Sequence, residues 1–279
     1  MKWHGLIGLA YPGLKNRTID CQLMSIIGRA YDNRAKIVAG SIDVGPHQCA
    51  GLLQYIEYCS GAAKLSKKLI EHGLRGCSLD IAYTADHSHN MLMAKGLRLF
   101  LDATTACQRK ALHWWGTPCS SFVILCSAHA QRAESNGWEG AWTERDFVMR
   151  GNCQALVCSL GIFLGWACEC LPVLEQPLSS CMPHLECLKT VLSFCGFEQT
   201  CTYMGAFNGP SVKPLQLWHL PGFDFENLAR PRPDPHSFMP LVCRGEDGSF
   251  TGMATDVQAS AEYTCDFGEA VAQIVRNLL

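Results

Sequence analysis

Two side chains with complementary chemistry each lie within two residues of a proline, in short motifs that also contain serines. Cys119 follows Pro118 in "HWWGTPCSSF", and Glu175 lies in "LEQPLSS". A thiolate is strongly nucleophilic near neutral pH when a helix N-terminus or backbone donors lower its pKa, and a neighbouring carboxyl group can act as a general acid. The chain contains 17 cysteines. The alternative role for Cys119 is therefore that of a small buried hydrophobic residue, which is the role we expect for nearly all the other cysteines.

The segments before Cys119 alternate between predicted strands and helices. Residues 52–59, "LLQYIEYC", are apolar and aromatic without a breaker and predict a buried strand. Residues 64–73 predict a helix with leucines on one side, lysines on the other and Gly73 at its C-terminal end. Residues 74–83 predict a second strand, and the three segments together form a βαβ unit.

The alternation continues through the rest of the chain. We expect helices at 89–96 and 105–112, and strands at 97–102 and 112–119. The apolar run at 155–174 predicts a buried helix that leads into a buried strand; its alternative interpretation is a membrane span, which the Glu and Pro near its end argue against. The remaining predictions are a helix at 185–196, strands at 199–207 and 214–220, and an amphipathic helix at 266–279.

Strands that alternate with helices predict an α/β fold. We expect a Rossmann-like, doubly wound and mostly parallel sheet with helices on both faces, arranged in three layers. Residues 1–50 are expected to form an N-terminal extension and residues 51–279 a single domain. Within this domain we predict a proline-rich connector at 221–240 and a C-terminal helix that returns to the first strand and turn.

The residues that follow each predicted strand are the most informative, because ligands of an open parallel sheet bind beyond the carboxyl ends of its strands. The turn 60–63 contains only small residues, and Asp80 follows about twenty residues later, which is the layout by which an α/β fold holds an adenosine ribose. Asp102 ends the next predicted strand and could bind an adenine amine. Taken singly, each has an ordinary alternative as a tight turn, a helix cap or a solvated acid.

The order of these motifs resembles that of the DNA cytosine-C5 methyltransferases, a branch of the S-adenosylmethionine-dependent methyltransferases. "EYCSGAAKLS" is similar to the first motif of that family, in which an acid and an apolar strand end precede Gly-x-Gly-Gly-Phe-Ser; Gly61 keeps the first glycine and Ala63 replaces the second. "GTPCSSF" is similar to Gly-Pro-Pro-Cys-Gln-x-Phe and "LEQPLSS" to the Glu-Asn-Val motif. "MGAFNGPSVKPLQLW" is similar to the Pro-Gln-x-Arg-x-Arg segment, and "GEAV" to the closing Gly-Asn-Ser-Val.

The resemblance implies a class I methyltransferase fold from about residue 53 to the C-terminus, and a covalent mechanism. Cys119 would add to C6 of a cytosine and make C5 nucleophilic, Glu175 would bond or protonate N3, and Lys213 would supply a cation. A target base inside a duplex would have to be flipped out. The cofactor would be S-adenosyl-L-methionine, and the residues that the resemblance implies for its binding are Ser60, Gly61, Ala62, Asp80, Asp102 and Pro118.

The sequence also departs from the family pattern. Lys213 and Leu215 replace the Arg-x-Arg pair, and the roughly fifty residues between Trp218 and the closing motif leave no room for the usual target-recognition domain. Two functions therefore stay open. One is a methyltransferase that acts on a cytosine in nucleic acid; the other is a catalytically degenerate member that binds the cofactor or serves as an interaction or scaffold module.

The composition indicates a globular protein and limits its partners. Hydrophobic residues make up 48% of the chain and the formal net charge is −2, so we expect no strong attraction to phosphate. The predicted partner is nucleic acid, DNA rather than RNA, bound without a basic patch; no membrane association and no metal site are expected. The many unpaired cysteines predict a reducing, intracellular location, either the nucleus or the cytoplasm.

Overall fold

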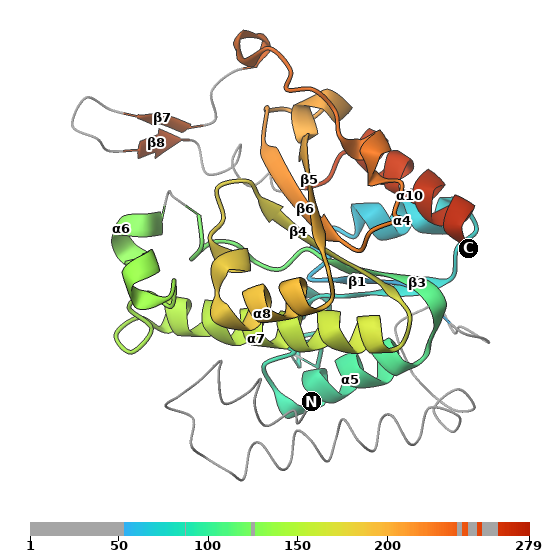
Figure 1. The fold of residues 1–279 in the computed structure, drawn as a ribbon, viewed down its shortest axis with the longest axis horizontal. Helices are drawn as coiled ribbons and strands as arrows, with labels where there is room; N and C mark the ends of the chain where they lie inside the picture. Colours follow the sequence, from blue (N-terminus) through green and yellow to red (C-terminus); the bar gives the residue numbers. More distant parts are fainter. Residues whose placement is uncertain (1–52, 87, 124–125, 239–241, 245–249, 253–261) are drawn as a thin grey trace.

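Six strands form one mixed sheet in the order β2-β1-β3-β4-β6-β5 (Figure 1). The computed structural model describes residues 53–86, 88–123, 126–238, 242–244, 250–252 and 262–279, so the predicted extension 1–50 lies outside the described residues. Strands β1 to β4 run parallel, and β6 runs antiparallel to both β4 and β5. The strands are β1 (Leu53–Tyr58), β2 (Gly76–Leu79), β3 (Cys107–Trp115), β4 (Leu171–Pro177), β5 (Glu198–Tyr203) and β6 (Pro214–His219).

Helices cover both faces of this sheet (Figure 1). One face packs against α5 (Ala94–Thr105), α7 (Asp146–Ala167) and α8 (Glu186–Phe194), and the other against α4 (Lys64–Glu71) and α10 (Cys265–Leu278). The fold is therefore α/β with three layers and a mostly parallel sheet. Smaller elements are α6 (Ser127–Ala130), the pair β7 (Val242–Arg244) and β8 (Phe250–Gly252), and 3-10 helices η1 (Ile81–Tyr83), η3 (Glu134–Asn136), η4 (Met182–His184), η5 (Met204–Phe207), η6 (Phe225–Leu228) and η7 (Pro235–Ser237).

Two adjacent tryptophans show how the sheet separates two cores. Side chains of successive residues in a strand point to opposite faces. Trp115 packs with Phe100 and stacks on Tyr58 at a ring-centroid distance of 3.9 Å, on the face that α5 and α7 cover. Trp114 packs with Phe267 of α10 on the other face. Both indoles are buried, so the strand that leads to Cys119 is fixed from both sides.

The sequence prediction is wrong between residues 89 and 112. The predicted strand 97–102 is part of helix α5, the predicted helix 89–96 covers only its start, and the predicted helix 105–112 is the first half of β3. The residues of 97–102 alternate in a way that suggests a strand, but the buried Phe100, Leu101 and Thr104 of α5 follow helical spacing. Asp102 therefore lies on a helix and does not follow a strand.

The polar start of β3 explains why that strand looked helical. The register between β1 and β3 shifts between Leu53 and Tyr55, and the exposed Arg109 and Lys110 lie where the register shifts. Lys110 adopts a positive φ of 63°, and its N–H donates to the Glu169 carbonyl at 2.7 Å. An irregularity of this kind lets charged residues occupy a central strand without being buried.

Helix α7 is long and apolar enough to cross a membrane by length and composition alone. Half of its most apolar stretch is buried inside the structure, where the helix packs against α5, α8, β3 and β4. The predicted helix that leads into a buried strand is thus confirmed, since β4 begins four residues after α7 ends. The C-terminal helix α10 packs along α4, beside the turn that follows β1.

Candidate functional site

The turn after β1 and the end of β2 are joined by one carboxylate. Gly61 adopts a left-handed φ of 52°, and its N–H donates to Asp80 Oδ2 at 2.8 Å. The other oxygen, Asp80 Oδ1, accepts from the N–H of Ala82 at 2.9 Å. Because β1 and β2 are adjacent parallel strands, their carboxyl ends meet and bring Asp80 beside the small-residue turn. That turn is Ser60, Gly61 and Ala62.

Tyr83 covers the same turn, and sequence reasoning missed it. Its hydroxyl is hydrogen-bonded to Ser60 Oγ at 2.7 Å and donates to the Gly61 carbonyl at 3.0 Å. Tyr83 is 41% exposed, whereas Ser60 is buried. The tyrosine reaches the turn from 22 residues away, so no local pattern marks it. Its partly exposed ring gives the Asp80 region an apolar surface.

Glu57, the acid of the first motif, is fully buried beneath this turn. Its Oε2 accepts from the Ser66 N–H at 2.9 Å and from Ser66 Oγ at 2.5 Å, while its Oε1 has no partner among the described residues. Burial raises the pKa of Glu57 to about 7, which outweighs the lowering by the two Ser66 hydrogen bonds. Because Ser66 lies in the first turn of α4, this carboxyl group fixes the start of that helix.

Replacing Glu57 with glutamine should remove a pH dependence of stability. A pKa raised from 4.5 to about 7 means that the contribution of this group to stability is fully present below about pH 4.5 and is lost as the pH rises to about 7. Between pH 5 and pH 8 the wild type should lose about 3 kcal/mol of unfolding free energy relative to Glu57→Gln. Urea unfolding at both pH values measures this. The exposed Glu144→Gln should retain the wild-type dependence; a Glu57→Gln profile parallel to the wild type would contradict the assignment.

The loop that carries Cys119 is tied to the neighbouring strand β4. The buried Gln176 of β4 donates from Nε2 to the Thr117 carbonyl at 2.7 Å, and its Oε1 accepts from Ser180 Oγ at 2.8 Å. The Phe122 N–H donates to the Cys119 carbonyl at 2.8 Å and closes the next turn. One amide side chain therefore fixes the loop of the candidate nucleophile and the segment after Glu175 at the same time.

Cys119, Glu175 and Lys213 lie close enough to influence one another electrostatically. Burial, followed by the nearby Glu175 carboxyl, raises the pKa of the Cys119 thiol to about 11, and the Lys213 ammonium opposes this. Burial likewise raises the pKa of Glu175, against the effects of Lys213 and of a hydrogen bond from Tyr263. Lys213 is near because it precedes β6, whose first residues pair with the end of β4.

A second tyrosine, Tyr263, connects Glu175 to the core. Its hydroxyl donates to Glu175 Oε2 at 2.9 Å and accepts from Trp114 Nε1 at 2.9 Å. Tyr263 precedes α10, and a Cβ on Gly116 would lie 2.9 Å from its hydroxyl oxygen. The side chain thus needs a glycine in the Cys119 loop. It was not predicted, because 88 residues separate it from Glu175.

The residues after Cys119 are held by a buried arginine. Arg132 donates from Nε to the Ser121 carbonyl at 2.7 Å and from Nη2 to Ser121 Oγ at 2.9 Å. It also donates from Nη1 to Asn152 Oδ1 at 2.8 Å, which joins the loop to α7. The guanidinium carbon lies 3.8 Å from the centre of the Phe122 ring. The segment that follows the candidate nucleophile is therefore rigidly placed.

Two predicted cofactor residues have different outcomes. Pro118 is exposed next to Cys119, in the loop that follows β3. Asp102 lies on α5, where its Oδ2 is 3.6 Å from Nε of Arg98, one helical turn away. The reason for assigning Asp102 to an adenine, its place at the end of a strand, is therefore wrong. Among the described residues, no group of three or more His, Cys, Asp or Glu side chains is arranged to hold a metal ion.

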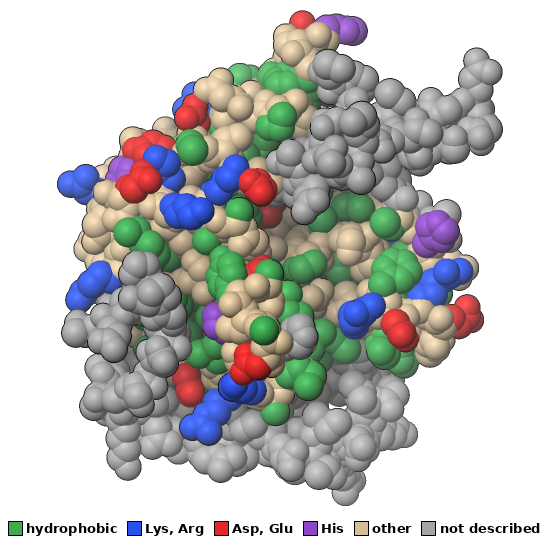
Figure 2. Space-filling view, turned by 180° about the vertical axis from the view of Figure 1, so that it is seen from behind, with side chains coloured by type: hydrophobic (Ala, Val, Ile, Leu, Met, Phe, Trp, Pro, Cys, Tyr) green, Lys and Arg blue, Asp and Glu red, His purple; other side chains and the backbone are tan. Residues whose placement is uncertain are grey.

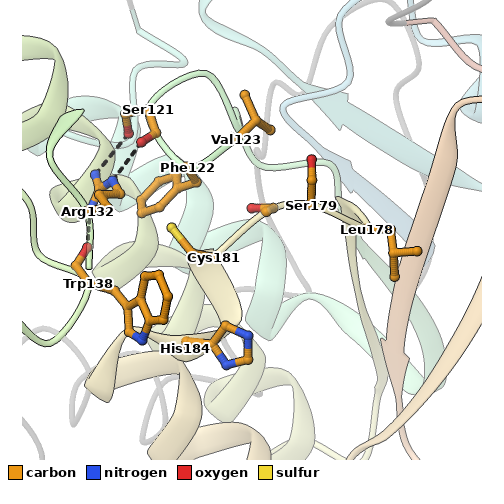
Figure 3. A pocket seen from close by; sticks show the side chains of 10 residues that line it. Ser121, Phe122, Val123, Arg132, Trp138, Leu178, Ser179, Cys181 and His184 are labelled. Atoms are coloured by element: carbon orange, nitrogen blue, oxygen red, sulfur yellow. Dashed lines mark hydrogen bonds between the residues drawn. The ribbon is translucent and has the colours of Figure 1, made fainter. Parts of the chain in front are cut away.

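A cavity of about 350 Å³ opens between the loop after Cys119 and the segment after Glu175 (Figure 3). The Cys181 N–H donates to the Phe122 carbonyl at 3.0 Å and holds the two segments together. Trp138 and His184 lie near each other at one side, with ring centroids 5.7 Å apart. The lining residues are Ser121, Phe122, Val123, Arg132, Trp138, Leu178, Ser179, Ser180, Cys181 and His184.

On the face opposite to that of Figure 1, the described side chains form no large patch of one charge sign (Figure 2). Lys and Arg side chains there are interspersed with Asp and Glu (Figure 2). This agrees with the formal net charge of −2.

Comparison of the chain with protein-family models and with curated proteins finds no match.

Proposed function

We propose that this protein is an S-adenosylmethionine-dependent methyltransferase with a class I methyltransferase-like fold, which methylates C5 of a cytosine in nucleic acid through a covalent adduct with Cys119. The observation that carries the proposal is the clustering of a thiol, a buried carboxyl group and an ammonium group at one edge of the sheet. Cys119 follows β3, Glu175 lies in β4 and Lys213 precedes β6. Glu175 raises the pKa of the Cys119 thiol, and the Lys213 ammonium lowers the pKa values of both Cys119 and Glu175.

The turn after β1 fits the adenosine part of the proposed cofactor. A Cβ on Gly61 would meet no atom within 4 Å, so the space beside this backbone is open. Each oxygen of Asp80 accepts one backbone N–H, and a carboxylate keeps further acceptor capacity for ribose hydroxyls. We infer that Ser60, Gly61 and Asp80 would hold the cofactor. When bound, S-adenosylmethionine would supply an electrophilic methyl group.

The side chains of the cluster are suited to activating cytosine C5. Attack by the Cys119 thiolate would form a bond between its sulfur and C6, and the electron pair of the C5–C6 double bond would move towards N3. Glu175, whose raised pKa lets it keep its proton at a higher pH than an ordinary glutamate, would protonate N3. After C5 has been methylated, a base such as water would remove the C5 proton, the thiolate would leave C6 and N3 would return its proton to Glu175, which restores the aromatic ring.

Cofactor binding should be lost when Asp80 is removed. S-adenosylmethionine at millimolar concentration should raise the melting temperature of the wild type, because a ligand that binds only the native state stabilises it. Asp80→Ala should weaken this binding at least about tenfold, since a charge-assisted hydrogen bond contributes about 1.5–3 kcal/mol. Asp86→Ala removes an exposed carboxylate that pairs with Lys95 and is the matched control. No shift in the wild type would exclude the proposed cofactor.

The activity itself is tested by methyl transfer. Wild-type protein, radiolabelled S-adenosylmethionine and cytosine-containing DNA or RNA oligonucleotides are incubated together, and digested products are analysed for 5-methylcytosine. We expect label in DNA. Cofactor binding without transfer to either nucleic acid would favour the second candidate, a degenerate cofactor-binding module. The observation in favour of that candidate is Leu215, which is fully buried where the resembled family has an arginine.

A further inference from the structure

We propose that the cavity between the Cys119 loop and the segment after Glu175 binds a nucleobase that neighbours the target cytosine. This inference rests on the proposed function and extends it to recognition of the sequence context. It assigns recognition of the neighbouring base to the domain that carries Cys119 and Glu175.

The position of the cavity carries the first step. Ser121 and Phe122 follow Cys119 by two and three residues, and Ser179 and Ser180 lie shortly after Glu175 in the chain. The cavity is therefore lined by residues that follow Cys119 and Glu175 closely in the chain. A strand with its cytosine at Cys119 would pass an adjacent nucleotide along this edge.

The shape and lining of the cavity carry the second step. Its volume of about 350 Å³ lies at the small end of the range for ligand sites and suits one planar ring. Trp138 and His184 offer aromatic surface, and bases stack on such rings with little sequence preference (Figure 3). Ser179 is exposed and can hydrogen-bond to a base edge.

The charge of the lining carries the third step. No Asp or Glu belongs to the lining, and its one permanent charge is the Arg132 guanidinium. That group is buried and donates to Ser121, Trp138 and Asn152, which fixes its charge beside the cavity. A fixed positive charge in a lining without carboxylates favours an anionic group, such as the phosphate that accompanies a nucleotide, over a cation.

Binding of a probe oligonucleotide tests the inference without catalysis. We would use a short single-stranded DNA with one cytosine and the fluorescent purine 2-aminopurine beside it, with the Cys119→Ser protein and no cofactor. The fluorescence of the purine should change saturably when it stacks on Trp138. Adding Trp138→Ala should weaken binding at least about tenfold, the loss expected for one stacked base. Trp142→Ala, which removes an exposed tryptophan outside the cavity lining, should leave it unchanged.

Two further measurements keep the test decisive. Ser179→Trp fills the cavity from an exposed position and should weaken binding as strongly as Trp138→Ala, even if the latter variant is poorly folded. In a competition assay, an oligonucleotide with an abasic site in place of the 2-aminopurine should bind the protein that retains Trp138 at least about tenfold more weakly. In Trp138→Ala, the abasic site should weaken binding no further. Additive losses, or equal affinities in all variants, would overturn the inference. This binding assay uses neither the cofactor nor the Cys119 thiol. If the losses are non-additive as expected but methyl transfer fails, only the proposed function is rejected.

Discussion

Cys119→Ser is expected to abolish covalent trapping by an oligonucleotide that contains 5-fluorocytosine. In the wild type, addition of the thiolate to C6 and methylation of C5 should leave an adduct that persists, because the fluorine on C5 cannot leave as a proton does. A serine hydroxyl in the same place is a far weaker nucleophile near neutral pH. We expect the rate of trapping, measured by gel shift and mass spectrometry, to fall at least about 1,000-fold.

The pKa of the thiol adds a second expectation to this experiment. Since burial and Glu175 raise the pKa of Cys119 to about 11, little thiolate is present at pH 7. Trapping should accelerate up to about tenfold per pH unit as long as Glu175 keeps the proton that it would give to N3, and should level off once Glu175 ionises. Lys213→Ala removes the charge that lowers this pKa and should slow trapping further. The control is Cys126→Ser, seven residues along the same segment. Adduct formation that survives in Cys119→Ser, or fails equally in Cys126→Ser, would refute the assigned nucleophile.

The parts of the fold that could be predicted are those in which local pattern and tertiary packing agree. The β1–α4–β2 unit and helices α8 and α10 are confirmed, although β2 covers only Gly76–Leu79 of the predicted strand 74–83. The apolar helix before β4 is confirmed as well, but α7 begins at Asp146, nine residues before the predicted apolar run. The error at 97–102 arose from the alternation around Leu97, Leu99 and Leu101. Arg98 and Asp102 lie four residues apart and form an ion pair on α5, and that spacing is the signal that could have identified a helix.

The candidate site could be predicted only where its residues belong to short motifs. Cys119 and Glu175 were predicted from their places in such motifs, and adjacent strands do bring them together. Tyr263 reaches Glu175 because it precedes α10, which packs on the face of the sheet that α4 also covers. Arg132 reaches Ser121 from the segment between α6 and η3. Contacts of this kind depend on how distant segments pack against the sheet. The spacing of residues along the sequence does not indicate which of them will meet.

Replacing Arg132 should destabilise the protein and loosen the loop that carries Cys119. It is buried and donates to Ser121, Trp138, Asn152 and the Val148 carbonyl. Arg132→Met keeps an apolar stem but leaves these acceptors without their donor. The cost of leaving buried polar groups unpaired is about 1–3 kcal/mol each, so we expect a loss of about 3 kcal/mol or more in unfolding free energy, measured in urea.

The same variant separates the two halves of the proposed site. The hydrogen bonds of Arg132 described above go to Ser121, Trp138, Val148 and Asn152, all outside the turn after β1. Below its melting temperature Arg132→Met should therefore still bind S-adenosylmethionine. Amide exchange at 120–123 should accelerate and trapping at Cys119 should fall, because the loop loses its anchor to α7. Arg150→Met, on the exposed side of α7, should change neither. If Arg132→Met lost cofactor binding and trapping in equal measure, the two sites would form one cooperative unit and the separate anchoring of the nucleophile loop would be wrong.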